Sequence, residues 1–297
     1  MKLIKLIQLC RPKQWVKNLF CFAAILFALQ LTNKYLLSLN ILAFAAFCFI
    51  SSIVYIINDI ADIEADKVHK RKRFRPLAAG DVTKKEAIIL AVVLFIITVG
   101  ICLFLNDRFK IVILLYLITN LIYTFKIKNI VLLDVFFISF GFILRVVGGA
   151  VAIDVSVSSW MLLTTIFISL FLAISKRRAE LSQTHDIERI GKQRKVLHHY
   201  SIAFTDQLNT IAATGTIIAY ALYTVAGTTI NTFNTDKLIY TTPFVIYGIF
   251  RYMYLIHKKN LGESPTQIVT KDPPIIINSI LWLIISFLII YKSRIGF

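Results

Sequence analysis

Residues 58–80 read NDIADIEADKVHKRKRFRPLAAG, and within this stretch an apolar sequence changes abruptly into dense charge. The apolar run 36–57 precedes it directly, so we predict that the helix formed by that run continues into the charged residues. At about 100° per residue, four polar side chains of the stretch then fall within an arc of about 100°. These four are Asn58, Asp59, Asp62 and Asp66. The sequence therefore predicts one acidic face where a long apolar helix ends.

This acidic face needs a positive partner, because its carboxylates repel one another and the carboxyl end of a helix disfavours anions. Clustered carboxylate and amide oxygens are ligands for a hard cation, and Mg²⁺ completes its shell with water and substrate phosphates. Basic residues that suit phosphate oxygens follow at once. They are Lys67, Lys70, Arg71, Lys72, Arg73 and Arg75. We therefore predict a diphosphate site that uses Mg²⁺, with Mn²⁺ as a substitute.

A simpler interpretation is a solvated, charged hairpin that only sets the membrane topology. A topology signal needs only Lys and Arg, whereas three aspartates on one helix face at a membrane boundary carry a cost that calls for an explanation. Glu64, by contrast, points to the far side of the same helix. The spacing of the aspartates therefore favours the diphosphate site.

The composition is that of an all-α integral membrane protein. Of 297 residues, 58% are hydrophobic and only 16% are charged, and the mean hydropathy is +0.75, which excludes the soluble globular class. The net charge of +17 comes from short loops between apolar runs, so it indicates cytoplasmic loops and phosphate partners rather than nucleic acid. The four cysteines lie in or beside apolar runs without CxxC spacing, and they predict neither a disulfide framework nor a zinc site.

Apolar stretches long enough to cross a bilayer predict nine transmembrane helices. They cover residues 16–32, 36–57, 86–105, 110–126, 129–153, 158–175, 208–230, 238–257 and 275–291. If the loops alternate between two sides, one side carries 25 of the 33 Lys and Arg residues and the other carries six. This imbalance predicts a multi-pass protein of the inner (cytoplasmic) membrane, with a cytoplasmic amino terminus and a carboxyl terminus outside.

The two long polar loops, 58–85 and 176–207, then both face the cytoplasm. We expect them to meet over one central cavity within a single membrane domain that covers residues 1–297. The first span, 16–32, follows a long basic segment and precedes many further spans, so we expect it to be retained rather than cleaved as a signal peptide.

The segment RPKQWVKN, residues 11–18, leads into the first span. Trp15 can be an interfacial anchor in the headgroup region, with the neighbouring lysines extending to water. The other interpretation is that Lys17 and Asn18 line the mouth of the cavity. The sequence leaves both open.

The second long loop also begins with charges of both signs. Lys176 and Glu180 lie four residues apart and share a helix face, with Arg177 beside them. They form either a structural ion pair at a helix end or the second half of the site. We favour the site, because this is the other cytoplasmic end that carries fixed charge of both signs.

Charged residues inside predicted spans are candidates for function, because burying a charge in a membrane is expensive. Asp134 and Arg251 lie near cytoplasmic ends, whereas Arg145 lies deeper and can instead bridge helices through backbone carbonyls. Tyr123, at the cytoplasmic end of the fourth span, is a weaker candidate. Gly148 and Gly149 suit close helix packing.

At this point the sequence resembles the UbiA superfamily of intramembrane prenyltransferases. The pattern Asn58-Asp59-x-x-Asp62-x-x-x-Asp66 is similar to its first aspartate-rich motif, and the superfamily fold has nine helices around a cavity open to the cytoplasm. Further segments resemble the decaprenyl-phosphate phosphoribosyltransferase branch. These are residues 11–18, residues 64–66, His69, residues 72–76 and 78–80, residues 176–181, and Gly262-Glu263.

The resemblance implies a Mg²⁺-dependent transferase that moves phosphoribose from phosphoribosyl pyrophosphate to a polyprenyl phosphate, as in lipid-linked sugar or cell-wall biosynthesis. Asp59, Asp62 and Asp66 would form the catalytic metal platform together with Asn58. Substrate contacts are expected from Lys17, Asn58, Lys72, Arg73, Arg75, Tyr123, Lys176, Arg177 and Glu180. A homo-oligomer is compatible with this assignment.

Two other functions remain open at this stage. The nearer is a prenyltransferase of the same fold with an aromatic or quinone-precursor acceptor. Such enzymes usually carry a second DxxxD motif where this sequence has Lys176 and Glu180, which disfavours that activity. The farther alternative is a transporter for an anionic solute. It is disfavoured because the sequence has no internal repeat and places its charge at helix ends rather than at the midplane.

Overall fold

The computed structural model describes residues 2–68, 72–182, 195–259 and 265–295. Within these ranges all regular elements are helices, which confirms the all-α prediction. Seven helices are long and apolar enough to cross a membrane. They are α3 (Lys34–Ala61), α5 (Lys84–Cys102), α6 (Asp107–Phe125), α7 (Leu133–Ala152), α8 (Ser159–Ser182), α10 (Ile202–Val225) and α14 (Pro273–Ile295).

The other two predicted spans take a different form. The expectation of one unbroken helix over 16–32 is wrong, since 3₁₀ helix η1 (Pro12–Phe22) and the short α2 (Ala23–Phe27) occupy this segment. The span predicted over 238–257 consists of η5 (Lys237–Thr241) followed by α12 (Thr242–Lys259). α12 has 18 residues and carries three Lys or Arg residues, at 251, 258 and 259. Seven spans are therefore confirmed, and the count of nine stays a prediction.

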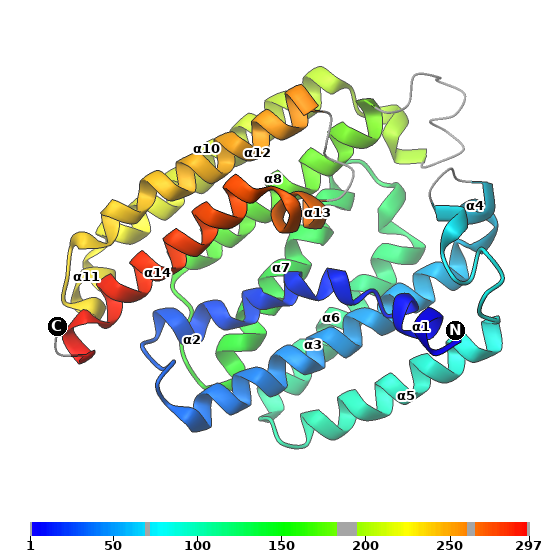
Figure 1. The fold of residues 1–297 in the computed structure, drawn as a ribbon, viewed down its shortest axis with the longest axis horizontal. Coiled ribbons are helices and arrows are strands. Elements are labelled where there is room, and N and C mark those ends of the chain that lie inside the picture. Colours follow the sequence, from blue (N-terminus) through cyan, green and yellow to red (C-terminus); the bar gives the residue numbers. More distant parts are fainter. Residues whose placement is uncertain (1, 69–71, 183–194, 260–264, 296–297) are drawn as a thin grey trace.

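The remaining elements are short. They are α1 (Lys2–Leu9), α4 (Ile63–Val68), η2 (Lys72–Phe74), η3 (Ile127–Asn129), η4 (Lys195–His199), α11 (Gly227–Phe233) and α13 (Pro265–Lys271). Lys5 of α1 forms an ion pair of 2.7 Å with Asp81, which ties α1 to the loop before α5. Figure 1 shows α1 and α4 at one end of the helix bundle and the end of α14 at the other.

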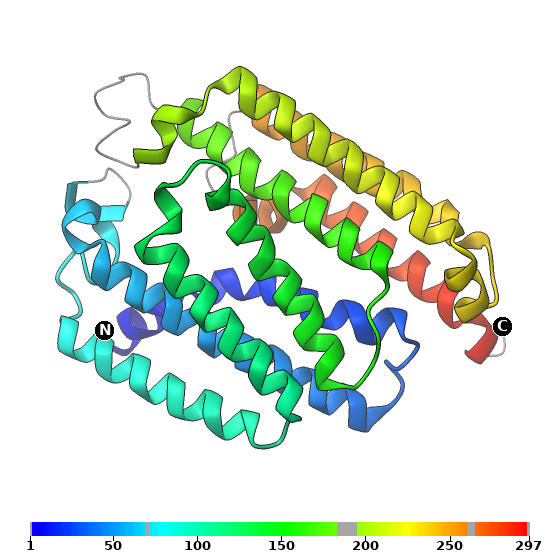
Figure 2. The ribbon, with the colours of Figure 1, turned by 180° about the vertical axis from the view of Figure 1, so that it is seen from behind.

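Two hydrophobic cores hold the bundle together. The first is built from η1, α3, α5 and α6, and the second from α8, α10, α12 and the start of α14. α7 contributes to both cores and packs on α6 as well as on α8, so it joins the two halves of the bundle (Figures 1 and 2).

Local sequence fixes where several of these helices begin. Asn33, Thr83, Asn106 and Ser201 each precede a helix, and each side chain accepts a hydrogen bond from an amide of the first turn. Thr83 also forms a reciprocal capping box with Glu86. Such caps satisfy amides that the helix itself leaves without a partner.

The surface of the bundle is apolar where a membrane would surround it. Only 22% of the apolar window of α5, and the same share of that of α14, is buried against protein. Large apolar side chains such as Ile89, Ile96 and Leu114 are exposed, while Asn40 and Ser52 are buried. This inverted pattern, with the seven apolar helices, is that of an integral membrane protein.

Gly148 and Gly149 permit the closest helix contact in the first half, as expected from their position. A Cβ atom on Gly149 would lie 1.9 Å from the carbonyl oxygen of Cys21, which belongs to η1. Asn40 of α3 donates hydrogen bonds from Nδ2 to the Cys21 oxygen (3.2 Å) and to the Gly149 oxygen (3.0 Å). The lack of a side chain at 149 therefore lets η1, α3 and α7 meet around one buried amide.

We expect Gly149→Ala to lower the free energy of unfolding by about 1–3 kcal/mol or more, because the added methyl group collides with backbone and cannot be relieved by a rotamer change. The measurement is the thermal unfolding midpoint of the purified protein in detergent. Gly100→Ala is the matched control, since nothing lies within 4 Å of a Cβ atom there. Equal midpoints for the two variants would contradict this account of the packing.

Candidate functional site

The acidic face lies where α3 ends, but the helix does not continue unbroken as predicted. α3 stops at Ala61, and Asp62 takes φ −102° and ψ 11° before α4 begins. The amides of Asp62 and Asp66 still donate to carbonyls four residues earlier, at 3.0 and 2.8 Å. The predicted register is thus largely kept, while the kink at Asp62 changes where the carboxylates point.

Asp59 and Asp66 converge on one guanidinium group. Arg75 Nη1 donates to Asp59 Oδ1 (3.0 Å) and to Asp66 Oδ2 (2.5 Å). Arg11 also pairs with Asp59, and its guanidinium lies 4.9 Å from the centroid of the Tyr55 ring. Both aspartates are almost fully buried, at 2% and 3% exposure, so this pairing supplies the compensation that buried carboxylates require.

The third carboxylate points elsewhere. Asp62 is half-buried, and its Oδ1 accepts a hydrogen bond of 2.9 Å from Lys128 of η3. The amide oxygen of Asn58 is buried and has no hydrogen-bond partner. A buried oxygen without a partner is costly in a bare protein and is typical of a group that meets a ligand.

The donor set therefore suits a hard divalent cation in chemistry, with an amide oxygen and three carboxylates on consecutive turns. Their arrangement is not that of a ready-made metal cluster. Among the described residues no three Asp, Glu, His or Cys side chains gather closely enough to hold a metal ion. Arg75 lies between two of the carboxylates, where a cation would compete with it.

The basic residues that follow are only partly described. Lys72 is half-buried, and exposed Arg73 places its guanidinium 4.8 Å from the Phe74 ring centroid. His69, Lys70 and Arg71 lie outside the described residues, as do residues 183–194 of the second polar loop and the Gly262-Glu263 pair.

The second charged cluster lies at the end of α8. Arg177 is fully buried and donates 2.6 Å hydrogen bonds to Asp134 and to Glu180, with a third of 3.4 Å to the Tyr123 hydroxyl. Lys176 lies 3.9 Å from Glu180, so the predicted pair of positions 176 and 180 exists.

Arg177 thus lies beneath this cluster rather than on its surface. Its N–H groups donate to acceptors of the protein, and these hydrogen bonds hold the side chains of Glu180 and Tyr123 in place. Direct contact of Arg177 with a substrate stays a prediction, and the geometry favours a role in positioning Glu180.

Tyr200 completes the second cluster and was not anticipated from the sequence. Its hydroxyl donates to Asp134 at 2.7 Å and accepts from the Leu132 amide at 2.9 Å. Burial, together with the hydrogen bond to Asp134, raises the pKa of Tyr200, so the hydroxyl stays protonated and keeps donating near neutral pH.

The connection between α6 and α7 links the two clusters. Lys128 contacts Asp62 of the first cluster, and Asp134, only six positions further on, contacts Arg177 of the second. Figures 1 and 2 show the described residues of both polar loops at the same end of the bundle. The predicted juxtaposition of the two loops at one end is therefore observed.

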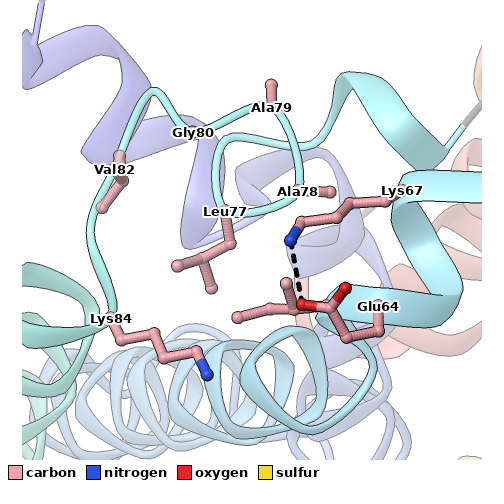
Figure 3. A pocket seen from close by; sticks show the side chains of 9 residues that line it. Glu64, Lys67, Leu77, Ala78, Ala79, Gly80, Val82 and Lys84 are labelled. Carbon is pink, nitrogen blue, oxygen red and sulfur yellow. Dashed lines mark hydrogen bonds and ion pairs between the residues drawn. The ribbon is translucent and has the colours of Figure 1, made fainter.

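Two hollows in the described part of the chain bear on the predicted central cavity. One hollow of about 430 Å³ lies on the Glu64 side of α4 and is drawn in Figure 3. A hydrogen bond from Lys67 lowers the pKa of Glu64 there. Another of about 310 Å³ lies between α3, α5 and α6 and has an apolar lining. None of the three site aspartates lines either, so the cavity stays a prediction.

Sequence reasoning missed three groups at the site, Arg11, Lys128 and Tyr200. Each is a polar residue near a predicted cytoplasmic end, and no local pattern sets it apart from its neighbours. Asp134 was found, because a carboxylate inside an apolar run is itself a signal.

Two further expectations concern charged or aromatic residues near membrane boundaries. The indole of Trp15 donates to Ser52 (3.1 Å) and packs on Phe49, so Trp15 contacts α3, and its role as an interfacial anchor stays a prediction. Arg251 pairs with Asp272, with contacts of 3.2 and 3.0 Å, and so joins α12 to the start of α14. Its hydrogen bonds lower the pKa of Asp272. Arg251 therefore has a structural partner rather than a place beside the aspartates.

Comparison with known proteins gives the family. Residues 18–268 match the model of the UbiA prenyltransferase family. The chain belongs to this family. A solved UbiA homolog from Archaeoglobus fulgidus, bound to GPP and Mg²⁺, superposes with a TM-score of 0.74 over 96% of this chain and 99% of that one. At 19% identity, this match shows that the fold is shared.

Two curated relatives from the family differ in how much of the chain they match. The decaprenyl-phosphate phosphoribosyltransferase of Mycolicibacterium smegmatis is 37% identical over 94% of this chain and 90% of its own length. The 4-hydroxybenzoate octaprenyltransferase of Shewanella loihica is 43% identical over 24% of each chain. The phosphoribosyltransferase thus matches both polar loops, and the octaprenyltransferase matches a short segment.

We expect Asp134→Ala to lower the free energy of unfolding by about 3–5 kcal/mol, because it removes the fully buried carboxylate partner of Arg177 and leaves only the partly exposed Glu180 to compensate a buried guanidinium. The thermal midpoint in detergent measures this. Asp107→Ala is the control, since Asp107 pairs with Lys110 at 92% exposure, where an ion pair contributes little. A loss at Asp134 no larger than at Asp107 would contradict the role assigned to this cluster.

Proposed function

We propose that the protein transfers the 5-phosphoribosyl group from phosphoribosyl pyrophosphate to a polyprenyl phosphate. The observation that carries the proposal is the near-complete match, at 37% identity, to a relative named for this activity. Membership of a family of transferases makes the chain a transferase enzyme. The mixed pair Lys176 and Glu180, 3.9 Å apart, supports the same substrate choice.

The charge of the site is consistent with this pair of substrates. Aromatic prenyl transfer presents one diphosphate, whereas phosphoribosyl transfer presents a diphosphate, a 5-phosphate and the phosphate of the lipid. One carboxylate platform is enough for one metal-bound diphosphate, and Lys176 adds a cation beside the second cluster. The basic side chains near residues 72–75 supply the further donors.

In the reaction the bond between ribose C1 and the diphosphate oxygen breaks, and its electron pair leaves with pyrophosphate. A bond forms between C1 and an oxygen of the polyprenyl phosphate. The acceptor oxygen is already ionised, so no general base is required. The charge that develops on the leaving group is the feature that the protein must stabilise.

Asn58, Asp59, Asp62 and Asp66 would hold a Mg²⁺ ion, which neutralises the departing pyrophosphate when bound. Arg75 now shares its donors between Asp59 and Asp66, and in the complex it turns toward the phosphates. Lys72 and Arg73 extend the same donor surface.

The second cluster receives the rest of the donor. Lys176 and Glu180 would contact the 5-phosphate and the ribose hydroxyls, with Tyr123 at the edge of the site. Arg177 holds Glu180 and Tyr123 in place from below. With the amino terminus in the cytoplasm, both clusters would face the compartment that holds the soluble donor.

A two-substrate assay tests the proposal. Purified protein is given radiolabelled phosphoribosyl pyrophosphate with and without a polyprenyl phosphate, and we expect label in the lipid phase only when both are present. If the protein instead prenylates 4-hydroxybenzoate from a prenyl diphosphate and leaves phosphoribosyl pyrophosphate untouched, the substrate assignment is wrong while the family assignment holds.

We expect activity to require Mg²⁺ or Mn²⁺, and Asp62→Asn and Asp66→Asn each to reduce kcat/KM at least about 100-fold while the protein stays folded, because the amide cannot replace a charged ligand. The thermal midpoint in detergent verifies folding. Glu64→Gln is the matched control, since Glu64 is exposed on the other side of α4, and it should act like the parent. Full turnover in a chelator, or by Asp66→Asn, would rule out the metal platform.

A further inference from the structure

Most buried or half-buried basic side chains near the site have a carboxylate partner, but two in the interior do not. Arg11 and Arg75 pair with Asp59, Lys128 with Asp62, and Arg177 with Asp134. Arg145, at 5% exposure, has hydrogen bonds only to neutral groups among the residues that the structure describes. The described part of the chain gives half-buried Lys17 no hydrogen bond or ion pair.

Arg145 is held from several sides by neutral acceptors. Its Nε donates to Asn18 Oδ1 (2.7 Å), Nη1 to the Gly141 oxygen (2.8 Å) and Nη2 to the Tyr116 hydroxyl (2.6 Å). The guanidinium also lies 4.8 Å from the Tyr116 ring centroid. These contacts fix its orientation, but none cancels its charge, and a buried charge without an opposite charge is unfavourable.

Lys17 adds a second positive charge beside the first. It directly precedes Asn18 in η1, the residue that accepts from Arg145. Two like charges in an interior of low dielectric repel each other, and a bound anion relieves this repulsion. A phosphate monoester carries between one and two negative charges near neutral pH, which matches the pair.

The backbone at Lys17 is also typical of a ligand site. Lys17 lies in η1, eleven residues of 3₁₀ helix that run between α3 and α7. Such helices rarely exceed four residues, and a 3₁₀ stretch inside a helix often marks a functional hinge or a sequence under strain. Within a membrane, backbone that is not α-helical is tolerated where protein covers it or where it lines a polar cavity.

Lys17 and Arg145 lie at a different depth in the bundle from the acidic face. Asn18 Nδ2 reaches Cys48 and Ser51 on α3, and Ser51 lies eight residues before Asp59, which is about 12 Å along the helix. In the proposed reaction the leaving diphosphate and the attacking phosphate lie on opposite sides of ribose C1. If the acidic face takes the diphosphate, the attacking phosphate belongs on the inner side.

We propose that Lys17 and Arg145 form a phosphate subsite in the membrane interior that binds the monophosphate headgroup of the isoprenoid acceptor. The inference rests on the proposed function and adds which residues take the acceptor. Phe142, whose ring centroid lies 5.2 Å from the Arg145 guanidinium, and Phe20, which packs on Phe142, offer an apolar surface to the first isoprene units. Arg145 is held rigidly, while Lys17 supplies the charge that adapts to the headgroup.

Binding of a probe to the intact protein in detergent tests the subsite without turnover. The probes are farnesyl phosphate and farnesol, which differ only in the phosphate group, and phosphoribosyl pyrophosphate is left out. We expect the parent to bind the phosphate at least 10-fold more tightly than the alcohol, and Lys17→Met to lose most of that preference. Lys17→Arg should restore it, because it returns the charge.

Steady-state kinetics then shows which phosphate monoester binds at the subsite, the headgroup of the polyprenyl phosphate or the 5-phosphate of phosphoribosyl pyrophosphate. Lys17→Met should raise KM for the polyprenyl phosphate about 10- to 100-fold, as expected for loss of a hydrogen bond to a charged group, and leave KM for phosphoribosyl pyrophosphate within about twofold. Lys13→Met, an exposed lysine one helical turn away, should resemble the parent. Arg145→Ala removes packing together with the charge, whereas Arg145→Lys keeps the charge and should retain the phosphate preference.

Three outcomes would overturn the subsite. They are no preference of the parent for farnesyl phosphate, an unchanged preference in Lys17→Met, or an increase in KM for phosphoribosyl pyrophosphate alone, which would assign the pair to the 5-phosphate. Failure of the proposed function is distinguishable, because the parent would then transfer no label from phosphoribosyl pyrophosphate in the two-substrate assay, whatever the binding results.

Discussion

Pairing of buried carboxylates with guanidinium groups is the constraint on which the end of the bundle that carries the two polar loops depends. Asp59 at the end of α3 joins Arg11 of the amino-terminal segment to Arg75 of the following loop. Asp134 at the start of α7 does the same for Arg177 of α8 and Tyr200. An unpaired carboxylate in such surroundings would be strongly unfavourable, so each pair fixes how segments far apart in sequence come together.

These pairs also explain how a site rich in charge can exist without its substrates. Arg75 neutralises two carboxylates that, in the proposed function, would bind a metal ion, and a diphosphate would bring anionic oxygens for the arginine to bind in exchange. On that proposal, binding would exchange one set of charge pairs for another rather than open a pre-formed metal cluster. The buried and unpartnered oxygen of Asn58 marks the place where the present pairing is incomplete.

Local patterns were sufficient to predict part of this arrangement. Helical periodicity predicted that Asp59, Asp62 and Asp66 lie on consecutive turns. Seven of the nine apolar runs correspond to long apolar helices. The partners Arg11 and Lys128 could not be predicted, because they lie 48 and 66 positions from the aspartates they contact and only packing brings them there. The kink at Asp62 could not be predicted either, because no Gly or Pro lies near it in the sequence.

The irregular amino-terminal segment shows the same limit most clearly, because its residues read as an ordinary apolar helix. Its conformation depends on a glycine more than a hundred positions away: the bare backbone of Gly149 admits the Cys21 carbonyl, and Asn40 bonds to both. That contact draws η1 against α7, which brings Asn18 within reach of Arg145. The missing side chain at 149 thus decides how closely η1 packs on α7, and a long-range steric fact of this kind has no signature in any local window of the sequence.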